Sequence, residues 1–146
     1  MRVKFERVLG FKPNLECRVC SFKISHDDSS GILVVVVEGA ADIGSIVAYT
    51  EQHIEVWANN PRVLWDLRDM DVTNVSSDQI CNLTSKFSQA NDRRNGDRSA
   101  IVTETGLGFS LGRLLVTYAE LNEAAVEHRL FQKRYDAEAW LWSRAQ

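Results

Sequence analysis

The chain has 146 residues, of which 45% are hydrophobic and 25% are charged. These values fit one domain with a hydrophobic core large enough to fold without disulfide bonds or structural metal ions. Its net charge of −3 disfavours nucleic acid as a partner, because phosphate binding needs a basic surface. The longest aliphatic run, residues 32–37, is too short to span a membrane, and three cysteines without a recognisable signal peptide predict free thiols in a reducing cytoplasm.

The first part of the chain predicts a β-hairpin behind an irregular start. Residues 1–14 show no clear periodicity, so we expect an N-terminal arm in front of a domain formed by residues 15–146. Residues 17–25 alternate and predict a strand. A turn rich in Asp, Ser and Gly then leads into the β-branched run of residues 32–38, which is typical of a central strand covered on both faces.

The middle of the chain predicts helix, strand and helix. Gly39 is expected to end the preceding strand, and Asp42 can cap a helix that continues to about Asn59 before a proline stops it. Residues 63–67 predict a buried strand. The sequence SSDQ, beginning at Ser76, has the spacing of a capping box and marks the next helix.

The last part of the chain repeats this alternation. Residues 99–103 and 127–133 predict strands, while Ser110 and Asp136 are expected to cap the helices that follow them. Strands alternating with helices favour parallel pairing through crossovers. We therefore predict one α/β domain with a mostly parallel sheet of four or five strands, packed helices, and the first strand antiparallel at an edge.

Three segments, in this order, resemble the STAS-like group, which comprises the anti-sigma-factor-antagonist (SpoIIAA-like) fold and its STAS/SEC14 relatives. They are VLWDLRDMDVTNVSSDQ, RSAIVT and RLFQKRYDAEAWL. The last segment is similar to the R-x-F and A-x-x-W-L close of SpoIIAA-like proteins, represented here by Arg129, Phe131, Ala137, Trp140 and Leu141. The resemblance implies a SpoIIAA-like fold and a bacterial, cytoplasmic regulatory module that binds a protein partner.

The resemblance also implies phosphoacceptor candidates at a helix start, Ser76 and Ser77. The helix N-terminus favours an added phosphate, whereas Asp69, Asp71 and Asp78 would oppose it by charge repulsion. The sequence departs from the family pattern, which has an aspartate before the serine and a glycine after it. The alternative interpretation is an ordinary helix cap.

The loop after the strand at residues 63–67 is the main candidate binding surface. Its candidate residues are polar or charged and follow a predicted parallel strand: Asp66, Arg68, Asp69, Asp71, Asn74 and Asp78. Asp66 and Asp69 could share acid–base work if burial separated their pKa values. The alternative interpretation is a loop held by an Asp–Arg pair and local Asx turns.

A glycine-containing segment before a helix is a candidate anion-binding loop. Backbone N–H groups near Gly106, Gly108 and Ser110 could hold an anion, with Arg113 assisting. The glycine spacing, with the third at Gly112, fits neither a Walker A loop nor a dinucleotide fingerprint. The alternative is a tight turn that precedes a helix.

The cysteines, histidines and tryptophans predict no metal and no cofactor. Cys17 and Cys20 fall in a predicted strand, where residues three apart point to opposite faces, and Cys81 is a single helical thiol. Three of the four tryptophans are assigned to the core: Trp57, Trp65 and Trp140. Trp142 is expected to cover an edge, contact the N-terminal arm or contribute to a homodimer interface.

Three functions remain open from the sequence. The leading expectation is a non-enzymatic regulatory or protein-interaction module, controlled by serine phosphorylation. The second is a binding module for a lipid or another small apolar ligand, which the lipid-binding relatives suggest. The third is a small enzyme that uses Asp66 and Asp69 with Ser76 or Arg113, although no cofactor motif accompanies them.

Overall fold

The aliphatic run that follows the first turn forms β3 (Ile32–Ala40), the strand at the centre of the fold. Its side chains alternate between two cores: Leu33, Val35 and Val37 pack on one face, and Ile32 and Val34 on the other. The expectation of a central strand covered on both faces is therefore confirmed. β3 pairs antiparallel with β2 (Ser21–Asp27), as the hairpin prediction required, and parallel with β4 (Arg62–Asp66).

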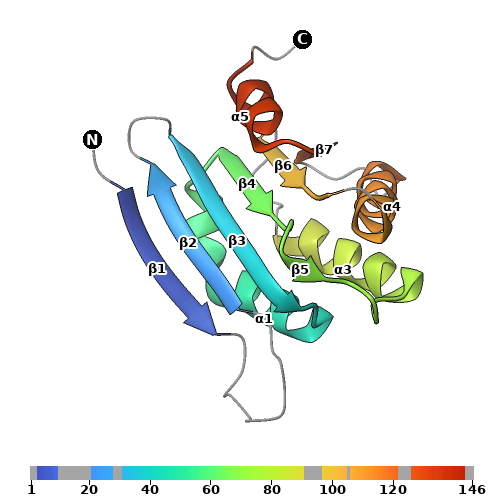
Figure 1. Ribbon diagram of the computed structural model, residues 1–146. Helices are drawn as coiled ribbons and strands as arrows, with labels where there is room; N and C mark the ends of the chain where they lie inside the picture. Colours follow the sequence, from blue (N-terminus) through green and yellow to red (C-terminus); the bar gives the residue numbers. More distant parts are fainter. Residues whose placement is uncertain are drawn as a thin grey trace.

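The computed structural model describes residues 3–9, 21–27, 31–90, 97–104, 106–121 and 126–143. The sheet runs in the order β1-β2-β3-β4-β6-β7 (Figure 1). Its two ends are β1 (Val3–Leu9) and β7 (Glu127–Phe131), and β6 (Arg98–Val102) lies between β4 and β7. Strands β3, β4, β6 and β7 are mutually parallel, which confirms the α/β class.

The part of the sheet that the structure describes has seven strands, five of them parallel, so the expected mostly parallel sheet of four or five strands is confirmed. Two of the seven strands were not expected. One addition, β1, lies in the range expected to be an arm, and it pairs antiparallel with β2 from Val3 opposite Asp27 to Leu9 opposite Ser21. β2 is therefore not the edge strand. The other addition is the two-residue β5 (Met70–Asp71), which pairs with the end of β3.

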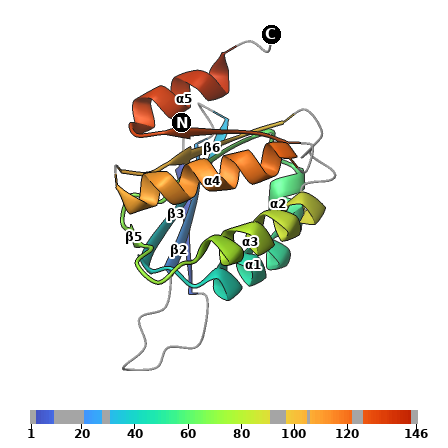
Figure 2. The same cartoon turned by 90° about the vertical axis from the view of Figure 1, so that its right-hand side faces the viewer.

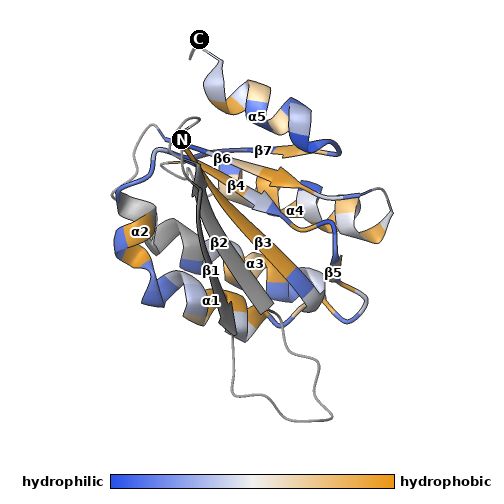
Figure 3. Ribbon diagram, turned by 60° about the vertical axis from the view of Figure 1, so that its left-hand side comes forward, coloured by the Kyte–Doolittle hydropathy of each residue, from blue (hydrophilic) through white to orange (hydrophobic). Residues whose placement is uncertain are grey.

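Helices cover the two faces of the sheet unequally. Three long helices, α1 (Ile43–Gln52), α3 (Ser77–Ala90) and α4 (Leu107–Leu121), lie on one face, and α5 (Arg134–Trp142) lies on the other (Figure 2). The larger core joins the first three helices to the sheet, and the smaller joins α5 to β3, β4 and β6. Figure 3 shows the hydrophobic residues along these strands and on the helix faces turned toward them.

The helix expected to run from Asp42 to Asn59 is two helices. Asp42 caps α1 as predicted, since its carboxylate accepts from the backbone N–H of Gly44 at 3.1 Å and from the Ser45 hydroxyl at 2.9 Å. The chain leaves helical geometry at His53, whose backbone N–H donates to two carbonyls of the last turn. The short α2 (Ile54–Ala58) follows.

Three expected element boundaries were wrong. Gly39 does not end its strand, because β3 continues to Ala40 with Gly39 at a φ of 91°, a value that glycine adopts readily. Ser110 does not cap α4, which begins at Leu107. Asp136 does not cap α5, which begins at Arg134, so the carboxylate lies in the first turn, where it still favours the helix dipole.

The C-terminal end of α5 is fastened to the rest of the fold. Arg62, at the start of β4, donates from Nε to the carbonyl oxygen of Leu141 at 3.0 Å, and its guanidinium carbon lies 3.9 Å from the centre of the Trp142 ring. The same ring packs on Gly31 in the turn before β3, at the place where a Cβ would stand. Trp142 therefore covers the end of the hairpin while remaining 48% exposed.

Candidate functional site

The carboxyl end of β4 carries a paired carboxylate and guanidinium. Asp66 is buried, and Arg68 donates to its two carboxylate oxygens from Nε at 2.8 Å and from Nη2 at 2.7 Å. The Arg68 backbone N–H adds a longer bond of 3.3 Å. This bidentate contact is the strong form of an Asp–Arg interaction, and it fixes the direction in which the chain leaves β4.

The charge on Asp66 is stabilised by its neighbours. Burial of the carboxylate acts to raise its pKa, but hydrogen bonds from Arg68 and the positive charges of Arg68 and Arg134 outweigh that effect and hold the pKa below its ordinary value. Asp66 is therefore ionised at neutral pH. The hydrogen bonds to Asp66 raise the pKa of Arg68, and the negative charges of Asp66, the exposed Asp69 and Glu104 act in the same direction. The arrangement matches the interpretation of a loop held by an Asp–Arg pair.

The loop that follows is folded back on the sheet by local hydrogen bonds. Asp71 accepts from the backbone N–H of Thr73 at 2.9 Å, an Asx turn of the predicted kind, and its own carbonyl accepts from Ala41 at 2.8 Å. Asn74 is exposed at the tip of the loop. The bonds around Asp71 hold the loop against the end of β3. Of the candidate residues of this segment, Asp66 is buried and the others are exposed.

The start of α3 is a capping box. The Ser76 hydroxyl accepts from the backbone N–H of Gln79 at 3.2 Å, and the Gln79 side chain accepts from the backbone N–H of Ser76 at 2.9 Å. This confirms the spacing prediction. Ser77 and Asp78 are exposed in the first turn. Both candidate phosphoacceptors are thus accessible, and Ser76 already has a structural role.

The candidate anion loop is a tight turn followed at once by a helix. Gly106 has a φ of 87°, and its carbonyl accepts from the backbone N–H of Ser110 at 3.0 Å, which closes the first turn of α4. Gly108 lies in that turn against the interior, whereas Arg113 is exposed one turn later. The predicted residues are therefore divided between the interior and the surface.

A cavity of about 80 Å³ lies between the sheet and helices α1, α3 and α4. Its wall is mainly aliphatic. The sheet contributes Val37, Trp65, Met70, Ser99, Ile101 and His128. The helices contribute Ile43, Ile46, Thr50, Ile80, Leu83, Gly108, Leu111, Gly112 and Leu115. The connecting segments contribute Ala41, Leu67, Val72, Val75 and Thr103. None of these described lining residues is Asp, Glu, Lys or Arg.

The polar residues of this wall differ in how they are bonded. Thr50 donates its hydroxyl to the carbonyl oxygen of Ile46 at 2.9 Å. Thr103, at the end of β6, is only 4% exposed, and its hydroxyl has no hydrogen-bonding partner among the described residues. Sequence reasoning missed Thr103 because no local spacing distinguishes it; its place after a buried parallel strand is the one available signal.

The other sequence candidates do not join a site within the part of the chain that the structure describes. Cys81 is exposed, and no three His, Cys, Asp or Glu residues there could hold a metal ion together. Cys17, Cys20 and the side chain of Trp57 lie outside the described residues. None of the helices described here is long and apolar enough to cross a membrane.

Comparison of the chain with family models, curated proteins and solved structures finds no significant match in any of the three. The functional interpretation therefore depends on the geometry described above.

Proposed function

We propose that this protein is a non-enzymatic binding module that holds a small apolar ligand in the cavity between its sheet and helices α1, α3 and α4. The observation that supports this proposal is the cavity itself, whose described wall is aliphatic, aromatic or uncharged polar. Well-packed protein interiors leave few spaces larger than a water molecule. A space of about 80 Å³ with such a wall suits hydrocarbon better than water, which needs two to four polar partners.

The position of the cavity also supports a ligand-binding role. Ligands of open α/β sheets tend to bind beyond the carboxyl ends of the strands. Thr103 follows β6 at this end of the sheet, and Leu67 and Met70 follow β4 there. The segment that carries Val72 and Val75 closes one side of the space, and it is held by short-range hydrogen bonds rather than by a strand of normal length. Such a segment can open locally to admit a ligand.

The test compares two leucines of α4 that differ in their relation to the cavity. Leu111 lines it, whereas Leu114 is also half-buried on α4 but does not. Native mass spectrometry of protein isolated from its own host should show added mass that is lost on denaturation. We expect this mass in wild type and in Leu114→Phe, and not in Leu111→Phe, whose larger ring fills the space. A bare chain in all three proteins would refute the proposal.

A second candidate function is the regulatory, partner-binding module that the STAS-like resemblance implies. The observation that favours it is that Ser76 and Ser77 are exposed at the start of α3, beside Asp71, Asn74 and Asp78. A phosphate on Ser76 would replace the hydroxyl of the capping box and add charge to the partner-binding surface. In this proposal the protein acts in the cytoplasm with a protein partner or a second copy of itself.

Fragmentation of the same host-isolated protein tests this second candidate. A phosphoryl group assigned to Ser76 or Ser77 would support it, and unmodified serines under every growth condition sampled would count against it. The two candidates share a structural element, because Val75 lines the cavity immediately before Ser76.

A further inference from the structure

We infer that the ligand of this cavity is electrically neutral and carries an oxygen acceptor that binds between the Thr103 hydroxyl and the first turn of α4. The inference rests on the proposed function, and it adds the chemical class of the ligand.

The first argument is the state of the Thr103 side chain. The backbone N–H of Thr103 donates to the carbonyl oxygen of Phe131 at 3.0 Å, so the sheet satisfies that group. The side chain lines the cavity, and its hydroxyl has no partner among the described residues although Thr103 is only 4% exposed. A buried hydroxyl that makes no hydrogen bond costs free energy, and a ligand oxygen in the cavity would remove that cost.

The second argument is the helix that begins beside this hydroxyl. The bond from the Ser110 N–H to Gly106 is the first of α4, so the helix itself provides no acceptor for the N–H groups before Ser110. One of these belongs to Gly108, which also lines the cavity. A Cβ placed on Gly108 would stand 4.0 Å from the Cβ of Thr103, so the two residues are adjacent. An oxygen between them could accept from both.

The third argument concerns charge and size. The described wall contains no Lys or Arg, and its ionisable member is His128, which pairs with Ser99 four residues before Thr103 along the sheet. A carboxylate bound at Thr103 would therefore be a buried charge without a partner, which is strongly unfavourable. Glu104, which follows Thr103, would add repulsion. The volume of about 80 Å³ is smaller than the roughly 150 Å³ of an engineered apolar cavity that accepts benzene. The class that fits is a short aliphatic ketone, aldehyde, ester or alcohol.

The test uses three probes of three carbon atoms, propane, acetone and propanoate, and follows their binding by NMR of the labelled Ile, Leu and Val methyl groups that line the cavity. Thr103→Val removes the hydroxyl and keeps the shape of the side chain. Thr50→Val is the matched control, because Thr50 also lines the cavity but already donates its hydroxyl to Ile46. Each protein is titrated with each probe at neutral pH.

We expect Thr103→Val to weaken the binding of acetone by about three- to ten-fold, the usual effect of one hydrogen bond, and to leave the binding of propane unchanged or slightly tighter. Thr50→Val should not discriminate between these two probes, and propanoate should bind weakest. If Thr103→Val affects ketone and alkane equally, or if propanoate binds more tightly than the ketone, the inference is overturned and the cavity function stands. If no probe, including propane, shifts the lining methyl groups, the proposed function itself fails.

Discussion

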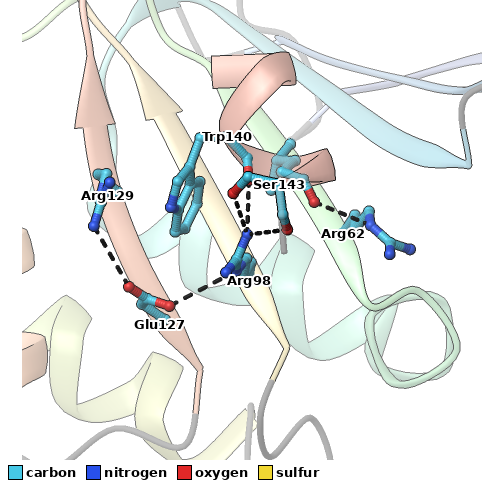
Figure 4. Close-up of polar contacts among 7 residues, drawn as sticks. Arg62, Arg98, Glu127, Arg129, Trp140 and Ser143 are labelled. Atoms are coloured by element: carbon cyan, nitrogen blue, oxygen red, sulfur yellow. Dashed lines mark hydrogen bonds and ion pairs between the residues drawn. The ribbon is translucent and has the colours of Figure 1, made fainter. Parts of the chain in front are cut away.

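Arg98 caps the C-terminal end of α5 with its guanidinium group and packs on the ring of Trp140 in the same helix (Figure 4). Its Nη1 donates to the carbonyl oxygen of Trp140 at 2.7 Å and to the carbonyl and hydroxyl oxygens of Ser143 at 2.8 and 2.9 Å. The last carbonyls of a helix lack intrahelical donors and carry partial negative charge. Arg98, the first residue of β6, therefore provides hydrogen-bond donors to carbonyl oxygens at the end of α5, which lies much later in the sequence.

Replacement of Arg98 by methionine should detach the end of α5. The variant keeps an apolar side chain beside Trp140 but loses the donors to the helix carbonyls. Because hydrogen bonds from a charged donor are worth about 1.5–3 kcal/mol, we expect the free energy of unfolding to fall by about that amount. Urea denaturation followed by circular dichroism measures the change.

The matched control is Arg129→Met. Arg129 also lies over Trp140, at 5.1 Å, but its side chain is 55% exposed and its described polar contact is a 3.8 Å ion pair with Glu127. Exposed ion pairs contribute little, so its loss should cost less than about 1 kcal/mol. Equal losses in the two variants would show that ring contact, rather than carbonyl capping, holds the helix.

Replacement of Asp66 by asparagine should reduce stability at neutral pH and not in strong acid. The pKa of Asp66 is lowered in the folded protein, so its contribution is present above the pKa of the unfolded chain and is lost as pH falls through the folded value. We expect a deficit of about 1.5–3 kcal/mol at pH 7, from the charged hydrogen bonds to Arg68.

That deficit should shrink below about pH 4, near the ordinary pKa of an aspartate. Thermal unfolding of both proteins between pH 2 and 7 would trace it. Asp69→Asn is the control, because it removes a neighbouring exposed carboxylate and keeps the Asp66–Arg68 hydrogen bonds, so it should cost less stability than Asp66→Asn at pH 7. A deficit for Asp66→Asn that is independent of pH would contradict the assignment of an ionised, paired carboxylate.

The capping box predicts unequal roles for the two adjacent serines. Ser76→Ala removes the acceptor for the Gln79 N–H and should lower the free energy of unfolding by about 0.5–2 kcal/mol. Ser77→Ala, inside the first turn, should change it by less than about 0.5 kcal/mol. Chemical denaturation of both variants provides the comparison. A larger loss at Ser77 would mean that the helix is capped one residue later.

Gly112 keeps α4 close to β7, and its replacement by alanine should be destabilising only while Leu130 is present. A Cβ at Gly112 would lie 2.7 Å from the Leu130 Cδ1 atom, which requires the leucine or the helix to shift. Overpacking of this kind costs about 1–3 kcal/mol, whereas alanine gains about 1 kcal/mol in helix propensity.

A double-mutant cycle separates these two effects. Gly112→Ala alone should be neutral to destabilising by up to about 2 kcal/mol. In a Leu130→Ala background, where the clash is absent, the same change should stabilise by about 1 kcal/mol. Additive effects in the cycle, measured by urea denaturation, would show that the two residues do not constrain each other.

Thr103→Val should stabilise the ligand-free protein, which is unusual for a buried substitution. The change removes a buried hydroxyl that lacks a partner among the described residues and keeps the volume, so we expect a gain of about 1 kcal/mol. Thr50→Val should instead lose stability, since it breaks the bond to Ile46. A loss of stability in Thr103→Val, seen by calorimetry, would show that the hydroxyl is already satisfied.

Several elements could be predicted because their causes lie within a few residues of sequence. The β-branched run of β3 identifies a strand that is covered on both faces. The hydrogen bonds that Asp42 makes as a cap, and those between Ser76 and Gln79, join residues at most three positions apart, so the residue spacing alone predicts these caps. Asp66 and Arg68 are two residues apart, and their pairing was one of the interpretations that the sequence left open.

Other features were missed or misplaced because weak local signals allow several boundaries. Ser110 and Asp136 are residue types that cap helices, yet both helices begin earlier. α4 begins after Gly106, which has a φ of 87°, and α5 begins after Lys133. Local preference permits a cap at several neighbouring positions, and packing of the helix on the sheet decides among them. The division of the α1 segment at His53 has the same origin.

The sequence by itself determined the α/β class, the central strand and the helix caps at Asp42 and Ser76, because hydrophobic periodicity and capping bonds act over a few residues. Only the tertiary structure decided what lies next to what. Val3–Leu9 becomes a strand because β2 offers a free edge, and Arg62 meets the end of α5 across a separation of 79 residues. The cavity around the Thr103 hydroxyl exists only where strands of the sheet meet helices α1, α3 and α4, and no local sequence pattern predicts that arrangement.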